Sequence, residues 1–131
     1  MLLRVHHVQI TIPRGAEDAA RAFYVGVLGL REVDKPASLR ARGGLWLATP
    51  DGAVQVHVGV EDGVDRAASK AHVAYAVRDL AAWRTRLESH GAVLLDGEPI
   101  PGMERFELRD PFGNRLELLE LEEPQADTPR P

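Results

Sequence analysis

Apolar and polar residues alternate along residues 5–12, and this pattern predicts a β-strand. His7 and Gln9 fall on one face of that strand, and the residues between them fall on the other. Over residues 16–28 the apolar positions recur every three or four residues, which predicts a helix that ends at Gly29. Three short strands are predicted to follow, at 30–33, 45–48 and 54–60. The first part of the chain therefore predicts the order βαβββ.

The second part of the chain repeats this order. A strand is predicted at 71–77, followed by a helix at 80–90 with Asp79 as its N-cap and Gly91 at its end. Strands are predicted next at 93–95, 105–109 and 115–121. The turn at 110–114 resembles the turn at 49–52, since both contain proline and glycine. We expect an α+β fold with module one at 4–60, module two at 70–121 and a disordered tail at 122–131.

Composition and charge narrow the classes of partner. The chain has 131 residues, a net charge of −4 and no clusters of Lys and Arg, which argues against binding to nucleic acid or to an anionic membrane. There is no cysteine, so any metal must be held by His, carboxylate or water. The first residues do not resemble a signal peptide, and no apolar run is long enough to span a membrane. These observations predict a cytoplasmic, single-domain protein whose partner is a small molecule.

Three residues with metal-binding side chains lie in short strand-like runs of the repeated pattern: His7, His72 and Glu117. Two imidazoles and one carboxylate can hold a divalent cation, here Mn, Fe, Ni or Zn, and leave coordination positions for a substrate. A carboxylate in the otherwise apolar strand 116–121 is costly to bury unless it is paired or bound to a metal. The simpler alternative is that these are strand residues with no ligand, and the fold decides between the two.

The chain resembles the vicinal oxygen chelate superfamily in four features. These are the repeated order βαβββ, the opening pair His7-Val8, the segment 22–30 and the segment 110–117. That superfamily includes glyoxalase I, fosfomycin-resistance proteins, extradiol dioxygenases and metal-free bleomycin-binding proteins. The resemblance covers about residues 4–121 and implies that the modules form half-open barrels. It also implies that the metal ligands come from the first and last strands of the modules, here His7, His72 and Glu117.

The last strand of module one is the position where glyoxalase I carries a further carboxylate and this chain does not. His57 is the nearest candidate for a fourth ligand, and a surface-facing strand histidine is the alternative. Gly52 and His57 are five residues apart, whereas Gly113 and Glu117 are four apart, so an ungapped overlay places Val56 opposite Glu117. A β-bulge could restore the match of His57. A second carboxylate would have to come from Glu61 or Glu107.

The resemblance implies an enzyme in which a metal accepts two adjacent oxygens of a small substrate and acts as a Lewis acid. A lyase, an isomerase and a dioxygenase all remain open, whereas fosfomycin-type transfer is disfavoured. The alternative is a metal-free protein that binds a drug or metabolite, as bleomycin-resistance proteins do. Candidate substrate contacts are Gln9, Trp46, Arg105 and Arg109, although an exposed polar strand face also explains the two arginines. A homodimer is expected, with the site formed within one chain or across two.

Overall fold

The computed structural model describes residues 1–122, and the predicted tail at 122–131 lies outside the described residues except for residue 122. The chain forms two compact units, which are described separately. The first unit contains residues 1–69 and the turn 110–114, and the second contains residues 70–109 and the described residues 115–122. The turn 110–114, which connects two strands of the second unit, thus belongs to the first unit by its contacts.

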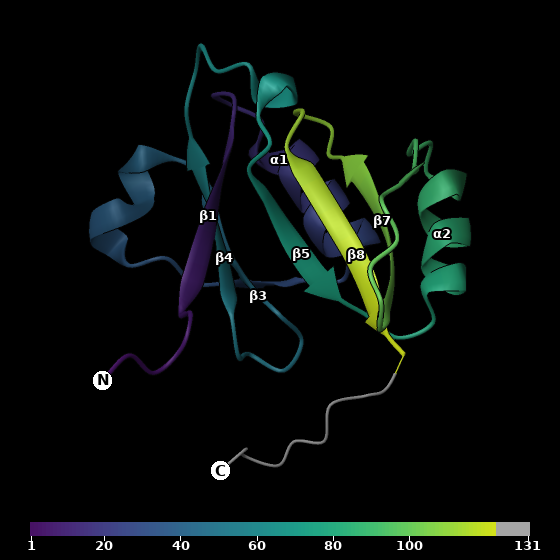
Figure 1. Ribbon diagram of the computed structural model, residues 1–131. Coiled ribbons are helices and arrows are strands. Elements are labelled where there is room, and N and C mark those ends of the chain that lie inside the picture. Colours follow the sequence, from purple (N-terminus) through teal and green to yellow (C-terminus); the bar gives the residue numbers. More distant parts are fainter. Residues whose placement is uncertain (123–131) are drawn as a thin grey trace. The chain divides into compact units, whose positions relative to one another are not determined.

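The first unit contains a four-stranded mixed sheet with the strand order β1-β4-β3-β2 (Figure 1). Its strands are β1 (His7–Ile12), β2 (Arg31–Val33), β3 (Leu45–Ala48) and β4 (Gln55–Val60). β1 runs parallel to β4, and the other neighbours are antiparallel. The predicted helix is present as α1 (Glu17–Ala20), which continues directly into the π-helical segment η1 (Arg21–Val27). Gly29 follows with a φ of +82°, which is the left-handed conformation that closes a helix.

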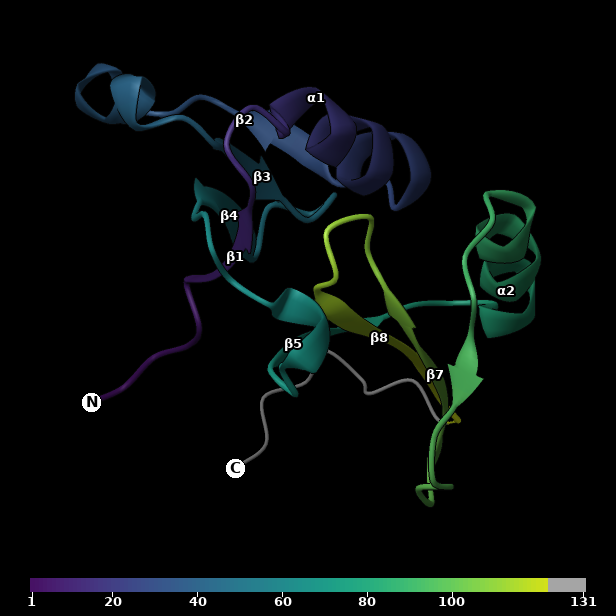
Figure 2. The same cartoon turned by 90° about the horizontal axis from the view of Figure 1, so that it is seen from above.

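The second unit repeats this topology with the strand order β5-β8-β7-β6. Its strands are β5 (His72–Ala76), β6 (Leu95–Asp96), β7 (Met103–Arg109) and β8 (Arg115–Leu121). β5 runs parallel to β8, as β1 runs to β4. The helix α2 (Leu80–Ser89) lies beside β7 in both views (Figures 1 and 2). The predicted α+β fold of two βαβββ modules is therefore confirmed.

Some predicted boundaries are wrong, and two short helices were not predicted. β7 begins at Met103 rather than at residue 105, because Met103 and Glu104 pair with the end of β8. Strand β6 is also displaced from the predicted 93–95. The two short helices are η2 (Ala37–Arg42) and η3 (Arg66–Ala68), and both have 3-10 geometry. They lie in connections whose sequence carries no periodic apolar pattern.

Each unit has its own apolar core. In the first unit Ile12 and Leu47 are completely buried, and in the second Leu87 and Phe106 are completely buried. Ile12, Leu47 and Phe106 lie on strands, where alternation places them on the inner face of each sheet, and Leu87 lies on the helix α2. In the part of the chain that the structure describes, no helix has the length and apolar character that crossing a membrane would require.

Polar side-chain contacts hold the turn 110–114 and the start of the helix α2. In the first unit the buried Tyr24 hydroxyl donates a hydrogen bond to Asp110 Oδ2 at 2.5 Å, and Asn114 Nδ2 donates to the carbonyl of Thr11 at 2.9 Å. In the second unit Asp79 caps α2 as predicted, by accepting from the backbone N–H of Ala82. These contacts hold the turn 110–114 against β1 and set the start of α2.

Candidate functional site

Three rings from three neighbouring strands form one stack in the first unit. Trp46 of β3 and His57 of β4 are directly paired, and their rings are parallel within 1° with centroids 4.0 Å apart. His7 of β1 lies on the other side of His57, with centroids 4.1 Å apart and an interplanar angle of 18°. We call these three residues the ring stack. The exposed His6 adds an edge contact, since its Nδ1 lies 2.9 Å from Nδ1 of His7.

His57 is the buried member of the ring stack, with 6% of its surface exposed. Its Nε2 lies 2.8 Å from Gln55 Oε1, two residues earlier on the same face of β4. Burial lowers the pKa of His57 below its ordinary value, and the neighbouring His7 and His6 add to the shift. His57 is therefore held as a neutral ring in a fixed orientation.

The registers of the two sheets show that His57 occupies the position equivalent to Glu117. His57 pairs with Gln9, which lies two residues after His7, and Glu117 pairs with Ala74, which lies two residues after His72. The ungapped overlay that placed Val56 opposite Glu117 is thus wrong. The register between β3 and β4 is regular, and the extra residue of module one lies in the turn 49–54 rather than in a bulge.

Glu117 and His72 lie together in the second unit. Glu117 is buried, with 7% of its surface exposed, although its side chain is a carboxylate. Its Oε2 is 3.4 Å from Nε2 of His72, and its Oε1 accepts a hydrogen bond from Arg105 at 2.8 Å. A buried carboxylate needs such partners, because desolvation without them is costly. One oxygen atom and one imidazole nitrogen are therefore presented side by side by β8 and β5.

Two further charged residues complete the cluster around Glu117. Glu107 lies directly opposite Glu117 in the register of β7 and β8, and it accepts hydrogen bonds from Arg105 and from Arg115. The bond from Arg115 holds the pKa of Glu107 below its usual value, and Arg105 adds to this effect. Sequence reasoning considered Glu107 but missed Arg115, although strict alternation along β8 places Arg115 on the same face as Glu117.

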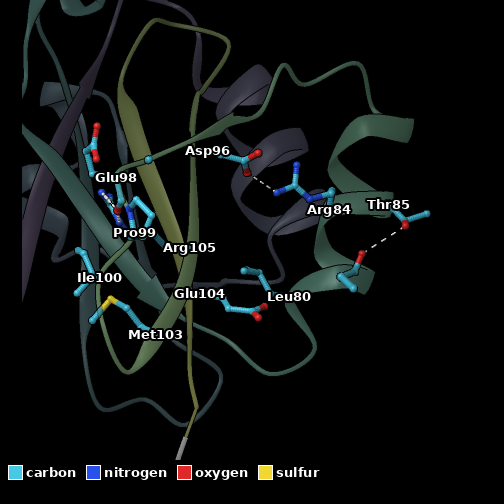
Figure 3. A pocket seen from close by; sticks show the side chains of 12 residues that line it. Leu80, Arg84, Thr85, Asp96, Glu98, Pro99, Ile100, Met103, Glu104 and Arg105 are labelled. Carbon is cyan, nitrogen blue, oxygen red and sulfur yellow. Dashed lines mark hydrogen bonds and ion pairs between the residues drawn. The ribbon is translucent and has the colours of Figure 1, made fainter.

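Arg105 connects this cluster to a groove of about 590 Å³ in the second unit (Figure 3). The guanidinium group of Arg105 donates to the carbonyl of Glu98 at 3.0 and 3.3 Å, and it lies over Gly97, where a Cβ would come within 2.5 Å of it. Arg84 and Asp96 form an ion pair of 2.6 Å across the groove. The other lining residues come from α2, the segment after β6 and β7: Leu80, Ala81, Thr85, Pro99, Ile100, Met103 and Glu104.

The remaining predicted contacts are distributed over the two units. Gln9 is an exposed residue of β1 that lies against Gly59, where a Cβ would come within 2.7 Å of its amide nitrogen. Arg109 is an exposed residue at the end of β7. His7 belongs to the first unit, whereas His72 and Glu117 belong to the second. Among residues 1–122 no group of three or more His, Asp and Glu side chains is arranged to hold one metal ion, so the predicted trio stays a prediction.

The sequence model of the Glyoxalase/Bleomycin resistance protein/Dioxygenase superfamily matches residues 4–118, and the repeated βαβββ topology agrees with it. The chain therefore belongs to this superfamily, and the resemblance to vicinal oxygen chelate proteins is confirmed. Members of the superfamily bind small molecules and commonly use divalent metals. No curated protein sequence matched the chain.

Solved structures include close matches in fold. A glyoxalase family protein from Bacillus anthracis is 36% identical, with a TM-score of 0.85 over 93% of this chain and 98% of that one. TnmS3, an antibiotic binding protein from a Streptomyces species, is 18% identical, with a TM-score of 0.71 over 93% of this chain and 100% of that one. FosX, a fosfomycin resistance protein from Listeria monocytogenes, is 11% identical, with a TM-score of 0.72 over 92% of this chain and 94% of that one. The last two similarities concern the fold alone.

Proposed function

We propose that this protein is a metal-dependent enzyme that binds a small substrate through two adjacent oxygen atoms. The observation that carries the proposal is the pair formed by His72 and Glu117, whose nitrogen and oxygen atoms lie 3.4 Å apart on neighbouring strands. Membership of a superfamily that commonly uses divalent metals supports the same conclusion. The reaction class stays open between a lyase, an isomerase and a dioxygenase.

The donor atoms fit a divalent metal of the first transition row. Imidazole and carboxylate ligands suit Mn, Fe, Ni and Zn, and two imidazoles with one carboxylate leave positions for a substrate. We assign the ligands as His7, His72 and Glu117, contributed by one chain or by two chains of a homodimer. The metal would act as a Lewis acid toward the bound oxygens. Light scattering in solution tests the dimer, which should have twice the mass of one chain.

The chain's own charges define the kind of substrate that this site would accept. In the second unit the carboxylates Glu107 and Glu117 are each paired with an arginine, Arg115 or Arg105. The negative charges are thus already balanced, and a divalent cation would bring positive charge that only a ligand can offset. Substrates that chelate through anionic oxygens should therefore bind better than neutral ones of the same shape.

Metal content tests this proposal directly. The purified protein, free of tags, is incubated with each of the four metals, desalted and analysed by mass spectrometry. Wild-type protein should retain about one ion per chain of the preferred metal, and Glu117→Gln should lose it, because the amide removes the anionic ligand without changing its size. Glu104→Gln is the matched control, since Glu104 is an exposed carboxylate on the neighbouring strand β7. Wild-type protein without bound metal would contradict the proposal.

A metal-free binding protein is the second candidate, and one observation favours it. Arg105 already neutralises Glu117 through a 2.8 Å hydrogen bond, so this buried carboxylate is stable without a metal. In that case Trp46, Gln9 and the arginines Arg105 and Arg109 would contact a drug or metabolite. Calorimetric titration of metal-free protein with a panel of aromatic antibiotics distinguishes the candidates, because only the second requires binding without metal.

A further inference from the structure

The ring stack brings His57 close to the proposed ligand His7, yet its geometry does not suit shared coordination. The lone pairs of an imidazole lie in the plane of its ring. The planes of His7 and His57 are within 18° of parallel and their centroids are 4.1 Å apart. Their lone pairs therefore lie in two separate, nearly parallel planes and do not converge on one ion.

The hydrogen bonding of His57 supports this reading. Its Nε2 lies 2.8 Å from the amide oxygen of Gln55, which can only accept, so Nε2 carries the proton and donates. A protonated nitrogen has no lone pair for a metal. The Nε2 atom of His57 is thus engaged by a side chain of β4 itself.

His7, by contrast, needs support from outside its own strand. It is exposed and lies on β1, which is the edge strand of the first sheet. Its imidazole would be free to rotate if nothing packed against it, and immobilising it on metal binding would then cost conformational entropy. His57 covers one face of this ring and is itself backed by the parallel ring of Trp46. The stack fixes the plane of His7 before any ligand arrives.

We propose that His57 and Trp46 are positioning residues that orient His7 for metal binding, and that His57 is not itself a ligand. This inference rests on the proposed function, because it takes His7 as a metal ligand. It assigns three protein ligands to the metal. It also gives Trp46 a role in supporting the site in place of direct contact with the substrate.

Two variants of His57 separate support from ligation. His57→Phe keeps a flat ring in the stack and removes both nitrogens, whereas His57→Ala removes the ring as well. Calorimetric titration with Mn²⁺, Ni²⁺ or Zn²⁺ should show wild-type affinity for His57→Phe and an affinity about 10–100-fold lower for His57→Ala, the usual effect of losing a residue that orients a ligand. His90→Ala is the control, since His90 follows α2 in the second unit and should leave the affinity unchanged.

A second measurement follows the stack in metal-free protein. The Hε1 proton of His7 should show a ring-current shift in the NMR spectrum, which is retained in His57→Phe and lost in His57→Ala. Equal loss of metal affinity in both variants would overturn the proposal and make His57 a ligand. An unchanged His7 signal and unchanged affinity in His57→Ala would also overturn it. Wild-type protein that binds no metal would instead refute the proposed function, and the NMR comparison distinguishes that failure from failure of the stack.

Discussion

Replacing Tyr24 with Phe removes one hydroxyl from the contact that holds the turn 110–114 within the first unit. The ring is buried, so Phe preserves the packing and leaves no cavity. The lost interaction is the 2.5 Å hydrogen bond from the hydroxyl to Asp110 Oδ2. A hydrogen bond to a charged acceptor is worth about 1.5–3 kcal/mol. The substitution should therefore reduce the free energy of unfolding by an amount in this range.

The other hydrogen-bond partners of Asp110 place the expected loss of stability at the lower end of this range. Its Oδ1 accepts from the backbone N–H groups of Phe112 and Asn114, at 2.9 and 2.8 Å, and its Oδ2 also accepts from Asn114 Nδ2 at 2.9 Å. Because these three bonds remain, the carboxylate of the variant is not left without partners. We expect a loss of about 1.5–2 kcal/mol. For a chain of this length that corresponds to a melting temperature lower by about 6–8 °C.

Urea unfolding followed by circular dichroism measures this loss. The midpoint should fall while the m value stays constant, because the surface exposed on unfolding does not change. In the Asp110→Asn background the same substitution of Tyr24 should cost only about 1 kcal/mol or less, since the bond then joins two neutral groups. A loss below about 0.5 kcal/mol in the wild-type background would place the effect among ordinary surface substitutions and refute the reasoning.

Three further substitutions, one in the second unit and two in the first, test contacts with the backbone. Glu120 accepts hydrogen bonds from two backbone N–H groups at the start of α2, and these bonds hold its pKa below the ordinary value of 4.5. The contribution of Glu120 to the free energy of unfolding is therefore present above pH 4.5 and is lost as the pH falls through the pKa of the folded state. The difference in stability between wild type and Glu120→Gln should accordingly shrink as the pH is lowered from about 5 to 3, and a constant difference in urea unfolding would contradict this. In the first unit a Cβ at Gly44 would lie 2.0 Å from the carbonyl oxygen of Val58, whereas a Cβ at Gly15, with a similar positive φ, meets nothing within 4 Å. Gly44→Ala should cost at least about 3 kcal/mol and Gly15→Ala about 1–2 kcal/mol, and equal losses in thermal unfolding would show that the contact is relieved without cost.

The sequence predicted the fold well because its signals are local. Alternation along 5–12 and 115–121 placed His7 and Glu117 on strands, and the structure has strands at His7–Ile12 and Arg115–Leu121. Gly29 and Gly91 were predicted to end helices, and both have positive φ values, of +82° and +86°. Turns and helix ends depend on the conformational freedom of one or two residues, so a single sequence is sufficient to locate them.

Register and ring packing could not be predicted in the same way. The overlay of the two turns assumed that they have equal length, whereas the turn 49–54 has one more residue than the turn 110–114. When this extra residue is taken into account, His57 and Glu117 occupy equivalent positions in the two sheets. The contact between His7 and His57 depends on parallel pairing of β1 with β4, which joins residues about 50 positions apart. Pairing of distant strands is decided by the whole sheet, so no local pattern in the sequence indicated the ring stack.

The same register position has acquired different chemistry in the two modules. Glu117 faces Glu107 across the strands, and this pair is kept in place by arginines, which makes the position ionic. His57 faces Trp46 instead, and this uncharged neighbour stacks its ring against that of His57. A carboxylate at position 57 would have no cation beside it among these strand neighbours and would be costly to bury. The partner on the adjacent strand thus determines which module can supply a charged ligand, and it favours Glu117 over position 57.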